Sequence, residues 1–337
     1  MSQLRFGIVG TGMSAGAIAD AIAQSTKGRL TAVSSRKIDK AASFVAERPG
    51  VRAVEGIENL LACDDIDATY IATSTTAKEE TAMAATAAGK HILVDKPFIN
   101  RDSVLRMSRA AADHGLAFMD ATHFVHHPRT LALQRAIPER IGTPRSLHTS
   151  FYFPLSDRGN IRFDVREEPM GAIGDMAWNS MRAIVEYLRP EGSVLKAVTI
   201  AEGVSQNKAV SRASGLIAFE GGKVSTFDVG LGSLAMDLQL LGTTGMITMD
   251  DFVLDWKDSF AFKNKADVGY FHRTGLAARK DIAFVSTPAN QAQEVSMIDD
   301  FAELVATGNA IERSACAEAS QKTQQYLDAV WAAANVR

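Results

Sequence analysis

The chain has 337 residues, 46% of them apolar, and its 36 basic and 39 acidic side chains give a formal net charge of −3. This length and composition suit two domains with large cores, and well-mixed charges without a basic stripe exclude nucleic acid as an expected partner. No apolar run reaches the roughly 20 residues of a membrane span, and no signal-peptide pattern opens the chain. We therefore expect a cytoplasmic protein that does not contact membranes.

The first predicted element is a short apolar strand over residues 4–9, which leads through a glycine turn into a helical pattern. Gly10 suits the turn, Gly12 lets a pyrophosphate approach the backbone, and Ala15 lets the helix pack close to the strand. The helix N-terminus offers free N–H groups and the positive end of its dipole to phosphates. Some turns of this pattern bind nothing, but its place between strand and helix favours a dinucleotide. The residues expected to hold the cofactor here are Gly10, Thr11, Gly12, Met13, Ser14 and Ala15.

A second strand is predicted over residues 30–36, and the residues at its end indicate which dinucleotide is bound. In this type of domain an acidic residue here holds the adenosine ribose, whereas a nearby arginine accommodates a 2′-phosphate. No carboxylate precedes Asp39, and the serine and basic side chains can donate hydrogen bonds to a phosphate. NADP is therefore favoured over NAD, although Arg36 could instead stack on the adenine without discriminating. The residues expected around the 2′-phosphate are Ser35, Arg36 and Lys37.

Short strands and helices then alternate as far as residue 120, which is typical of the doubly wound parallel sheet of a Rossmann domain. Further strands are predicted at 51–54, 68–73, 91–94 and 116–120, with helices at 39–47, 57–61, 79–88 and 103–114. Ligands of such sheets lie beyond the carboxyl ends of the strands. The cofactor residues expected at two of these ends are Thr73, Ser74, Asp95, Lys96 and Pro97.

Beyond residue 122 the strands become longer and form hairpins, which predicts an α+β domain with an open, mainly antiparallel sheet. We expect the dinucleotide-binding domain over 1–122 and the second domain over 123–337. Its predicted strands are 145–153, 195–203, 214–220, 223–231, 236–241 and 246–250, and its closing helices are 295–307 and 316–334. Residues 154–169 are predicted to form a long loop, of a kind that often covers a site, and 270–292 an irregular segment.

The segment Asp95-Lys96-Pro97 ends a strand at the expected cofactor edge. Pro97 restricts the preceding residue to extended geometry and so limits where the lysine points. A lysine held near a nicotinamide can position a substrate hydroxyl and act as a general acid/base. Elsewhere such a pair would be a surface lysine beside a proline turn, but its place in this architecture favours the catalytic interpretation.

A helix is predicted from Gly171 to about residue 188, and it carries three polar side chains on one face. Asp175 and Asn179 are four residues apart, and Arg182 follows three residues later. Asp175 also suits the positive end of the helix dipole, which is an ordinary structural role. If this face is turned toward a nicotinamide, Asp175 can instead hydrogen-bond a substrate hydroxyl.

Three segments together resemble the glucose-fructose oxidoreductase/inositol dehydrogenase/MocA (Gfo/Idh/MocA) family: Gly10–Ala15, Gly89–Pro97 and Gly171–Asn179. The resemblance spans essentially the whole chain, and further segments look similar to the branch with dihydrodiol and xylose dehydrogenases and uncharacterised plant oxidoreductases. It implies a Rossmann domain followed by a substrate-binding and oligomerisation domain. It also implies hydride transfer between NAD(P) and a sugar, cyclitol or related polyol, in homodimers or homotetramers formed through the C-terminal sheet.

The family's Glu-Lys-Pro stands here as Asp95-Lys96-Pro97, which implies Lys96 as the catalytic lysine. Its Asp-x-x-x-His/Tyr stands as Asp175-x-x-x-Asn179, and an asparagine cannot titrate. Asn179 therefore either orients the substrate while Lys96 moves the proton, or marks a catalytically silent NADP(H)-binding sensor or scaffold. In the first case His123, His126 or Tyr152 could assist Lys96. Another departure is Lys78, where relatives often place a histidine.

The histidines at 123, 126 and 127 have spacings that metal ligands on a helix could share, but no carboxylate or cysteine accompanies them in the sequence. We expect no metal site, and one of these histidines near the substrate. In the loop over 154–169, Asn160 and Arg162 are candidate substrate contacts. The residues expected to bind the substrate are Lys96, His123, Asn160, Arg162, Asp175 and Asn179, of which Lys96, Asp175 and Asn179 are expected to be catalytic.

Overall fold

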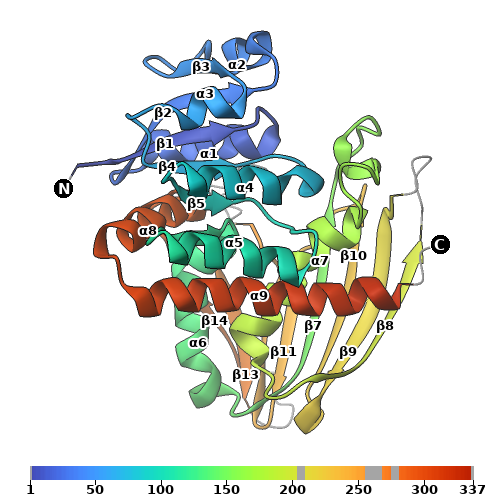
Figure 1. The fold of residues 1–337 in the computed structure, drawn as a ribbon. Helices are drawn as coiled ribbons and strands as arrows, with labels where there is room; N and C mark the ends of the chain where they lie inside the picture. Colours follow the sequence, from blue (N-terminus) through green and yellow to red (C-terminus); the bar gives the residue numbers. More distant parts are fainter. Residues whose placement is uncertain (1, 203–208, 255–267, 275–280, 335–337) are drawn as a thin grey trace. The chain divides into compact units, whose positions relative to one another are not determined.

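The computed structural model describes residues 2–202, 209–254, 268–274 and 281–334. The chain forms two compact units, which Figure 1 colours along the sequence. The first unit contains residues 1–123 and 294–321, and the second contains 124–293 and 322–337. The sequence alone assigns residues 294–321 to the second domain, whereas in the structure they pack with the first unit.

In the first unit, six described strands form one parallel sheet in the order β3-β2-β1-β4-β5-β6. This order is that of a doubly wound sheet and confirms the predicted Rossmann fold. The strands are β1 (Leu4–Val9), β2 (Gly28–Ser35), β3 (Arg52–Glu55), β4 (Ala68–Ile71), β5 (His91–Val94) and β6 (Phe118–Asp120). The helices are α1 (Met13–Gln24), α2 (Ile38–Val45), α3 (Ile57–Leu61), η1 (Thr75–Ala77), α4 (Lys78–Ala87), α5 (Arg101–Asp113) and α8 (Gln293–Thr307), and α9 (Ala310–Ala333) begins here.

The core of this unit combines the N-terminal strands with a helix from near the end of the chain. All four residues of β4 are buried, as are Phe6 and Ile8 of β1, because parallel sheets are covered on both faces. The ring of Phe301 in α8 lies 6.0 Å from that of Phe6, measured between centroids. The hydroxyl of Ser25 donates to the carboxylate of Asp299 at 2.5 Å. These contacts explain why residues 294–321 belong to the first unit.

In the second unit, eight described strands form a sheet in the order β14-β13-β12-β11-β7-β10-β9-β8. All neighbouring strands are antiparallel except β7 and β10, which confirms the predicted mainly antiparallel sheet. The strands are β7 (Pro144–Phe153), β8 (Val194–Glu202), β9 (Arg212–Phe219), β10 (Val224–Leu231), β11 (Leu238–Gly242), β12 (Gly245–Met249), β13 (Gly269–Thr274) and β14 (Ile282–Ser286). The helical segments are η2 (His123–His126), α6 (Pro128–Arg140), η3 (Ile161–Phe163), α7 (Gly171–Ala183), η4 (Ile184–Leu188) and η5 (Glu220–Gly222), with the end of α9.

Several predicted boundaries differ from the structure. Residues 270–292 are not irregular throughout, because β13 and β14 occur there, and this prediction is wrong; residues 275–280 lie outside the described residues. β14 is an edge strand with four of its five residues exposed, so it lacks the alternation that identifies a strand in sequence. Helix α9 begins at Ala310 rather than near 316. The predicted strand over 195–203 is observed as β8, while residue 203 lies outside the described residues.

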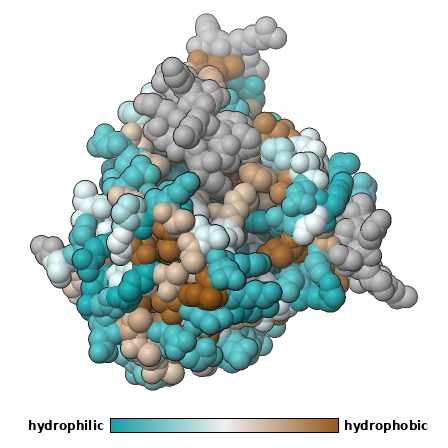
Figure 2. Space-filling view, turned by 90° about the horizontal axis from the view of Figure 1, so that it is seen from above, coloured by the Kyte–Doolittle hydropathy of each residue, from teal (hydrophilic) through white to brown (hydrophobic). Residues whose placement is uncertain are grey.

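Figure 2 shows a predominantly hydrophilic face, on which hydrophobic residues form small separate groups. None of the described helices is long and apolar enough to cross a membrane. In the second unit, the edge strand β8 exposes Leu195, Val198 and Ile200. Such a strand offers both apolar side chains and unpaired backbone groups to another chain.

Candidate active site

The turn between β1 and α1 forms a bare helix N-terminus at the carboxyl edge of the first sheet. Gly10 has φ of +115°, and a Cβ placed on it would lie 2.7 Å from the carbonyl oxygen of Ala72, so the turn requires glycine. Gly12 has no atom within 4 Å of a Cβ position, and it caps α1 without a side-chain hydrogen bond. Thr11 precedes it, and Met13–Ala15 begin the helix. The first N–H groups of α1 are therefore available to an anion, and no side chain at Gly12 stands in its way.

Two buried hydroxyl groups near the same edge have no hydrogen-bond partner within the described chain. They belong to Ser34, in β2, and to Thr73, just after β4. A buried polar group without a partner costs about 1–3 kcal/mol. Beyond Ser34, Ser35 is half-buried and Arg36 and Lys37 are exposed. The two basic side chains are thus accessible to a 2′-phosphate.

The segment after β5 lies at this edge too, because all six strands of the sheet are parallel. Asp95 and Lys96 are half-buried, Pro97 is buried, and the peptide bond between Lys96 and Pro97 is cis. The buried ammonium of Lys78 donates a hydrogen bond of 2.8 Å to the carbonyl oxygen of Pro97. The structure thus brings together the strand ends on which the sequence places the cofactor residues, and it adds Lys78 as a contact of Pro97.

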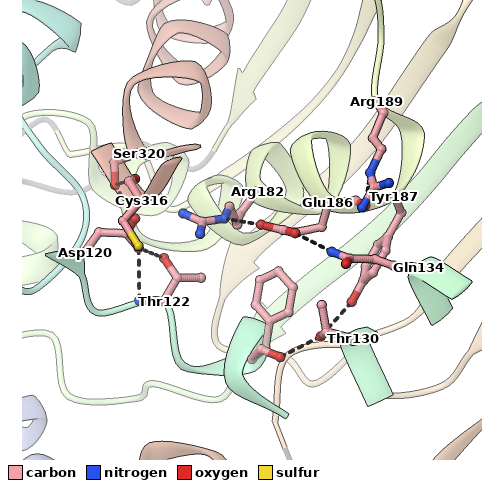
Figure 3. Close-up of polar contacts among 11 residues, drawn as sticks. Asp120, Thr122, Thr130, Gln134, Arg182, Glu186, Tyr187, Arg189, Cys316 and Ser320 are labelled. Carbon is pink, nitrogen blue, oxygen red and sulfur yellow. Dashed lines mark hydrogen bonds and ion pairs between the residues drawn. The ribbon is translucent and has the colours of Figure 1, made fainter. Parts of the chain in front are cut away.

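The last strand of the first sheet ends in a buried carboxylate, that of Asp120 (Figure 3). It accepts hydrogen bonds from the N–H of Thr122 at 3.1 Å, from the hydroxyl of Thr122, and from the hydroxyl of Ser320 at 2.5 Å. Val94, which ends β5, pairs with Asp120 in register. This network therefore supports the strand end that leads to Lys96. Ser320 lies 200 residues from Asp120 in the sequence, so no local pattern connects these two members.

In the second unit, helix α7 is buried along its whole length. Its first residue, Gly171, has φ of +52°, and a Cβ there would lie 2.4 Å from the carbonyl oxygen of Val210. The N–H of Ala172 donates to that same oxygen at 2.7 Å. The glycine thus lets the helix begin directly against the backbone before β9. Polar side chains on a helix buried all round need partners, either protein groups or a ligand.

One such side chain, Asp175, forms an ion pair with the guanidinium of Arg162. The Asp175 side chain is 7% exposed and that of Arg162 is 19% exposed. Asn160 caps the short helix η3 and accepts a hydrogen bond of 3.1 Å from the N–H of Arg162. The structure therefore groups three residues that the sequence proposes separately as substrate contacts. The guanidinium and the carboxylate balance each other's charge within this unit.

Asn179 and Arg182 follow on α7, and both are buried. Arg182 donates to Glu186 at 2.8 Å, and Gln134 of α6 donates to the other carboxylate oxygen at 2.7 Å (Figure 3). Next to them, the hydroxyl of Tyr187 lies 3.1 Å from that of Thr130, and burial raises the pKa of Tyr187 to about 12. Arg182 thus takes part in a network that ties α7 to α6.

Tyr152 lies on β7, with its neighbour Phe151 buried on the other face of the strand. Its hydroxyl donates to Asp228 at 2.6 Å and accepts a hydrogen bond from Arg212 at 2.9 Å. Burial and the bond to Asp228 raise the pKa of Tyr152 to about 12. The tyrosine therefore belongs to a polar network on the sheet, and its proton is held tightly.

The three histidines have separate environments. In the first unit, Nδ1 of His123 lies 3.5 Å from the carboxylate of Glu294. In the second unit, His126 is half-buried, and His127 caps α6 by accepting a hydrogen bond of 2.9 Å from the N–H of Arg129. Within the described chain no group of three His, Cys, Asp or Glu side chains could hold a metal ion.

Residues 4–122 match the model of an oxidoreductase family with an NAD-binding Rossmann fold, GFO_IDH_MocA. A dTDP-3,4-didehydro-2,6-dideoxy-alpha-D-glucose 3-reductase of Actinomadura kijaniata is 34% identical over 171 residues, which are 50% of this chain and 51% of that protein. A scyllo-inositol 2-dehydrogenase (NADP(+)) of Bacillus subtilis is 31% identical over 150 residues, 44% of this chain and 45% of that protein. The chain thus aligns with about half the length of each of these two relatives.

A solved structure extends the similarity to the whole fold. It is that of a 3-ketoreductase from Actinomadura kijaniata in complex with NADP and TDP-benzene. The two chains superpose with a TM-score of 0.83 at 26% identity, over 98% of this chain and 97% of the other. Both units are therefore shared with that reductase.

Proposed function

Because residues 4–122 match the GFO_IDH_MocA oxidoreductase family and the chain shares its fold with a ketoreductase, we propose that this chain belongs to the Gfo/Idh/MocA family and transfers hydride between NADP(H) and a sugar, cyclitol or related polyol. The observation that carries the proposal is the bare N-terminus of α1 behind Gly10 and Gly12, at the sheet edge that also bears Lys96. The relatives support it, since a reductase and a dehydrogenase of sugars and cyclitols are among them.

The first unit supplies the cofactor site. The N–H groups of the first turn of α1 bind the pyrophosphate, and Arg36 and Lys37 bind the 2′-phosphate, because both are exposed beyond the end of β2. When bound, the nicotinamide accepts the hydride from a carbinol carbon or donates it to a carbonyl carbon. NADP is the favoured cofactor, as in the dehydrogenase and the ketoreductase above.

Each unit carries its own candidate residues for the substrate and for proton transfer. Lys96 is the general acid/base: in the oxidation direction it takes the hydroxyl proton, and in reduction it returns it. Asp175 accepts a hydrogen bond from a second substrate hydroxyl, while Arg162 keeps the carboxylate oriented. Asn179 orients the substrate through its amide, and proton transfer does not require it to titrate. Asn160 and His123 complete the candidate contacts.

Turnover of a substrate panel tests this function. Purified protein is incubated with NADP(H) and with aldoses, ketoses, inositols and dihydrodiols, and the absorbance of the reduced nicotinamide is followed. Turnover that is lost in Lys96→Ala and kept in Lys40→Ala supports the enzyme, because Lys40 is an exposed lysine of the same unit. Tight binding of NADPH with no turnover across the panel indicates instead a silent cofactor-binding sensor, as a non-titrating Asn179 would permit.

The exposed apolar residues of β8 support self-association through the second sheet. Ile200 is 61% exposed on this edge strand, and we expect a homodimer or homotetramer by light scattering that Ile200→Asp weakens. Cys63 and Cys316 form no disulfide, which fits a reducing, cytoplasmic environment. A monomer at micromolar concentration would exclude this self-association.

A further inference from the structure

The buried lysine at the start of α4 stands in an unfavourable place for a cation. Lys78 is 2% exposed and occupies the first position of the helix, where the dipole has its positive end. Burial of an ammonium group also costs free energy unless oxygen atoms replace its water. The two glutamates that follow, Glu79 and Glu80, are the residues this turn favours. A lysine with an unfavourable helix position and a buried ammonium group is expected where its contacts support a functional site.

The ammonium group of Lys78 connects two neighbouring strand ends. It donates to the carbonyl oxygen of Pro97 at 2.8 Å and to the hydroxyl of Thr75 at 3.4 Å. Thr75 belongs to the segment after β4 and Pro97 to the segment after β5, and the two strands are paired in register up to Ile71 and Val94. Because proline has no N–H, the carbonyl is the only backbone group through which Pro97 can be anchored by a hydrogen bond.

We propose that Lys78 is a positioning residue that fixes the backbone at Lys96–Pro97 and thereby the direction in which the Lys96 side chain leaves its strand end. The inference rests on the proposed function of Lys96 as the general acid/base. Lys96 has a long, flexible side chain, so the placement of its ammonium depends on how firmly its backbone is held. A misplacement of about 1 Å at a reacting group can cost on the order of 100-fold in rate.

Two lysine-to-methionine variants test the proposal. Lys78→Met removes the donor and keeps an unbranched side chain of similar length. The matched control is Lys90→Met: Lys90 is 9% exposed, lies in the same unit, and donates to the carbonyl oxygens of Cys63 and Ile66 at 2.9 Å each. Lys90 precedes β5, so its contacts lie at the opposite, amino edge of the sheet. Both variants lose a buried contact of lysine with carbonyl oxygen, but only one contact adjoins Lys96.

The measurements are kcat and KM for a sugar that the wild type turns over, the Kd of NADPH, the Tm, and amide hydrogen exchange of the peptide containing Phe98. In Lys78→Met we expect kcat to fall about 10- to 100-fold, with KM and Kd within about threefold, and faster exchange at Phe98. Lys90→Met should lower Tm at least as much and leave kcat within about threefold. If Lys78→Met does not fold, Lys78→Gln, whose amide is too short to reach Pro97, should show the same loss of kcat.

Equal losses of kcat in the Lys78 and Lys90 variants would overturn the proposal, as would unchanged kcat and exchange in Lys78→Met. Failure of the proposed function has a different signature, because the wild type then turns over no sugar. Exchange at Phe98 in that case still decides whether Lys78 fixes this segment.

Discussion

Replacement of Gly12 by alanine adds one methyl group beside the N-terminus of α1, where we propose that the pyrophosphate binds. Apart from Gly12 itself and its two neighbours in the chain, no protein atom lies within 4 Å of that methyl position. The backbone angles of Gly12, φ −81° and ψ −174°, are open to any residue. The folded chain therefore accommodates the alanine without collision. A steric cost arises only when a phosphate group lies against this part of the backbone.

The expected effects on stability and on binding differ in size. Alanine is a poorer N-cap than glycine, so the free energy of unfolding should fall by about 0.5–1 kcal/mol. A phosphate held away by the methyl group loses at least one charge-assisted hydrogen bond from the N–H groups of α1, which contributes about 1.5–3 kcal/mol. The Kd of NADPH should therefore rise about 10- to 150-fold.

Fluorescence titration with NADPH and urea denaturation measure these two quantities. Gly16→Ala is the matched control, because Gly16 also has no atom within 4 Å of a Cβ position but lies inside α1. There alanine should stabilise the helix by up to about 1 kcal/mol and leave NADPH affinity unchanged. Wild-type affinity in Gly12→Ala would refute the argument that the pyrophosphate lies against Gly12.

Three further predictions concern the backbone, the pH dependence and the cofactor. Gly171→Ala should destabilise the protein by at least about 2 kcal/mol, since its Cβ would lie 2.4 Å from the Val210 oxygen. The control is Gly232→Ala: Gly232 has a positive φ, but a Cβ there would meet no atom within 4 Å, so this variant should lose only about 1–2 kcal/mol. Equal Tm values for the two variants would contradict the contact argument. Burial lowers the pKa of His91 to about 4, so only the unfolded chain gains a proton at this histidine as the pH falls from 6.5 to 4. The free energy of unfolding, measured by urea denaturation, should therefore fall by about 2 kcal/mol across this window, and the contribution is fully present above pH 6.5. A His91→Asn variant with the same pH dependence of stability would contradict this. Arg36→Ala should weaken NADPH binding about 10-fold or more and NADH binding by less than about threefold; parallel losses in a titration would mean that Arg36 stacks on the adenine.

Local patterns predicted the first unit well because its features are set by neighbouring residues. The glycine turn at Gly10–Ala15 combines a strand, a turn and a helix start within a dozen residues, and the parallel order of the strands follows from their alternation with helices. Family resemblance then connected Lys96 with Asp175; the fold is confirmed, and residues 4–122 match the family model. The roles of Lys96, Asp175 and Asn179 remain predictions that the experiments above address.

The sequence missed features that depend on tertiary contacts. It singled out Arg162 and Asp175 but had no means of pairing them, because the pair forms between a loop and a helix. The contact of Lys78 with Pro97 is a similar case. β14 escaped notice because an exposed edge strand carries no buried face, and its periodicity is correspondingly weak.

The packing of Phe301 against Phe6 has a consequence for how the protein folds during synthesis. The dinucleotide-binding unit includes residues 294–321, so the ribosome releases its last part after nearly the whole chain. Until then, the Rossmann sheet lacks α8 and exposes part of the apolar surface around Phe6. Contacts between residues so far apart carry a large loop-closure entropy and slow the final step of folding. The unit that binds the cofactor is therefore the first whose translation begins, but it is not complete until residues 294–321 have been made. Segment 124–293 of the second unit is translated before those residues, so the second sheet can assemble before the first unit is complete.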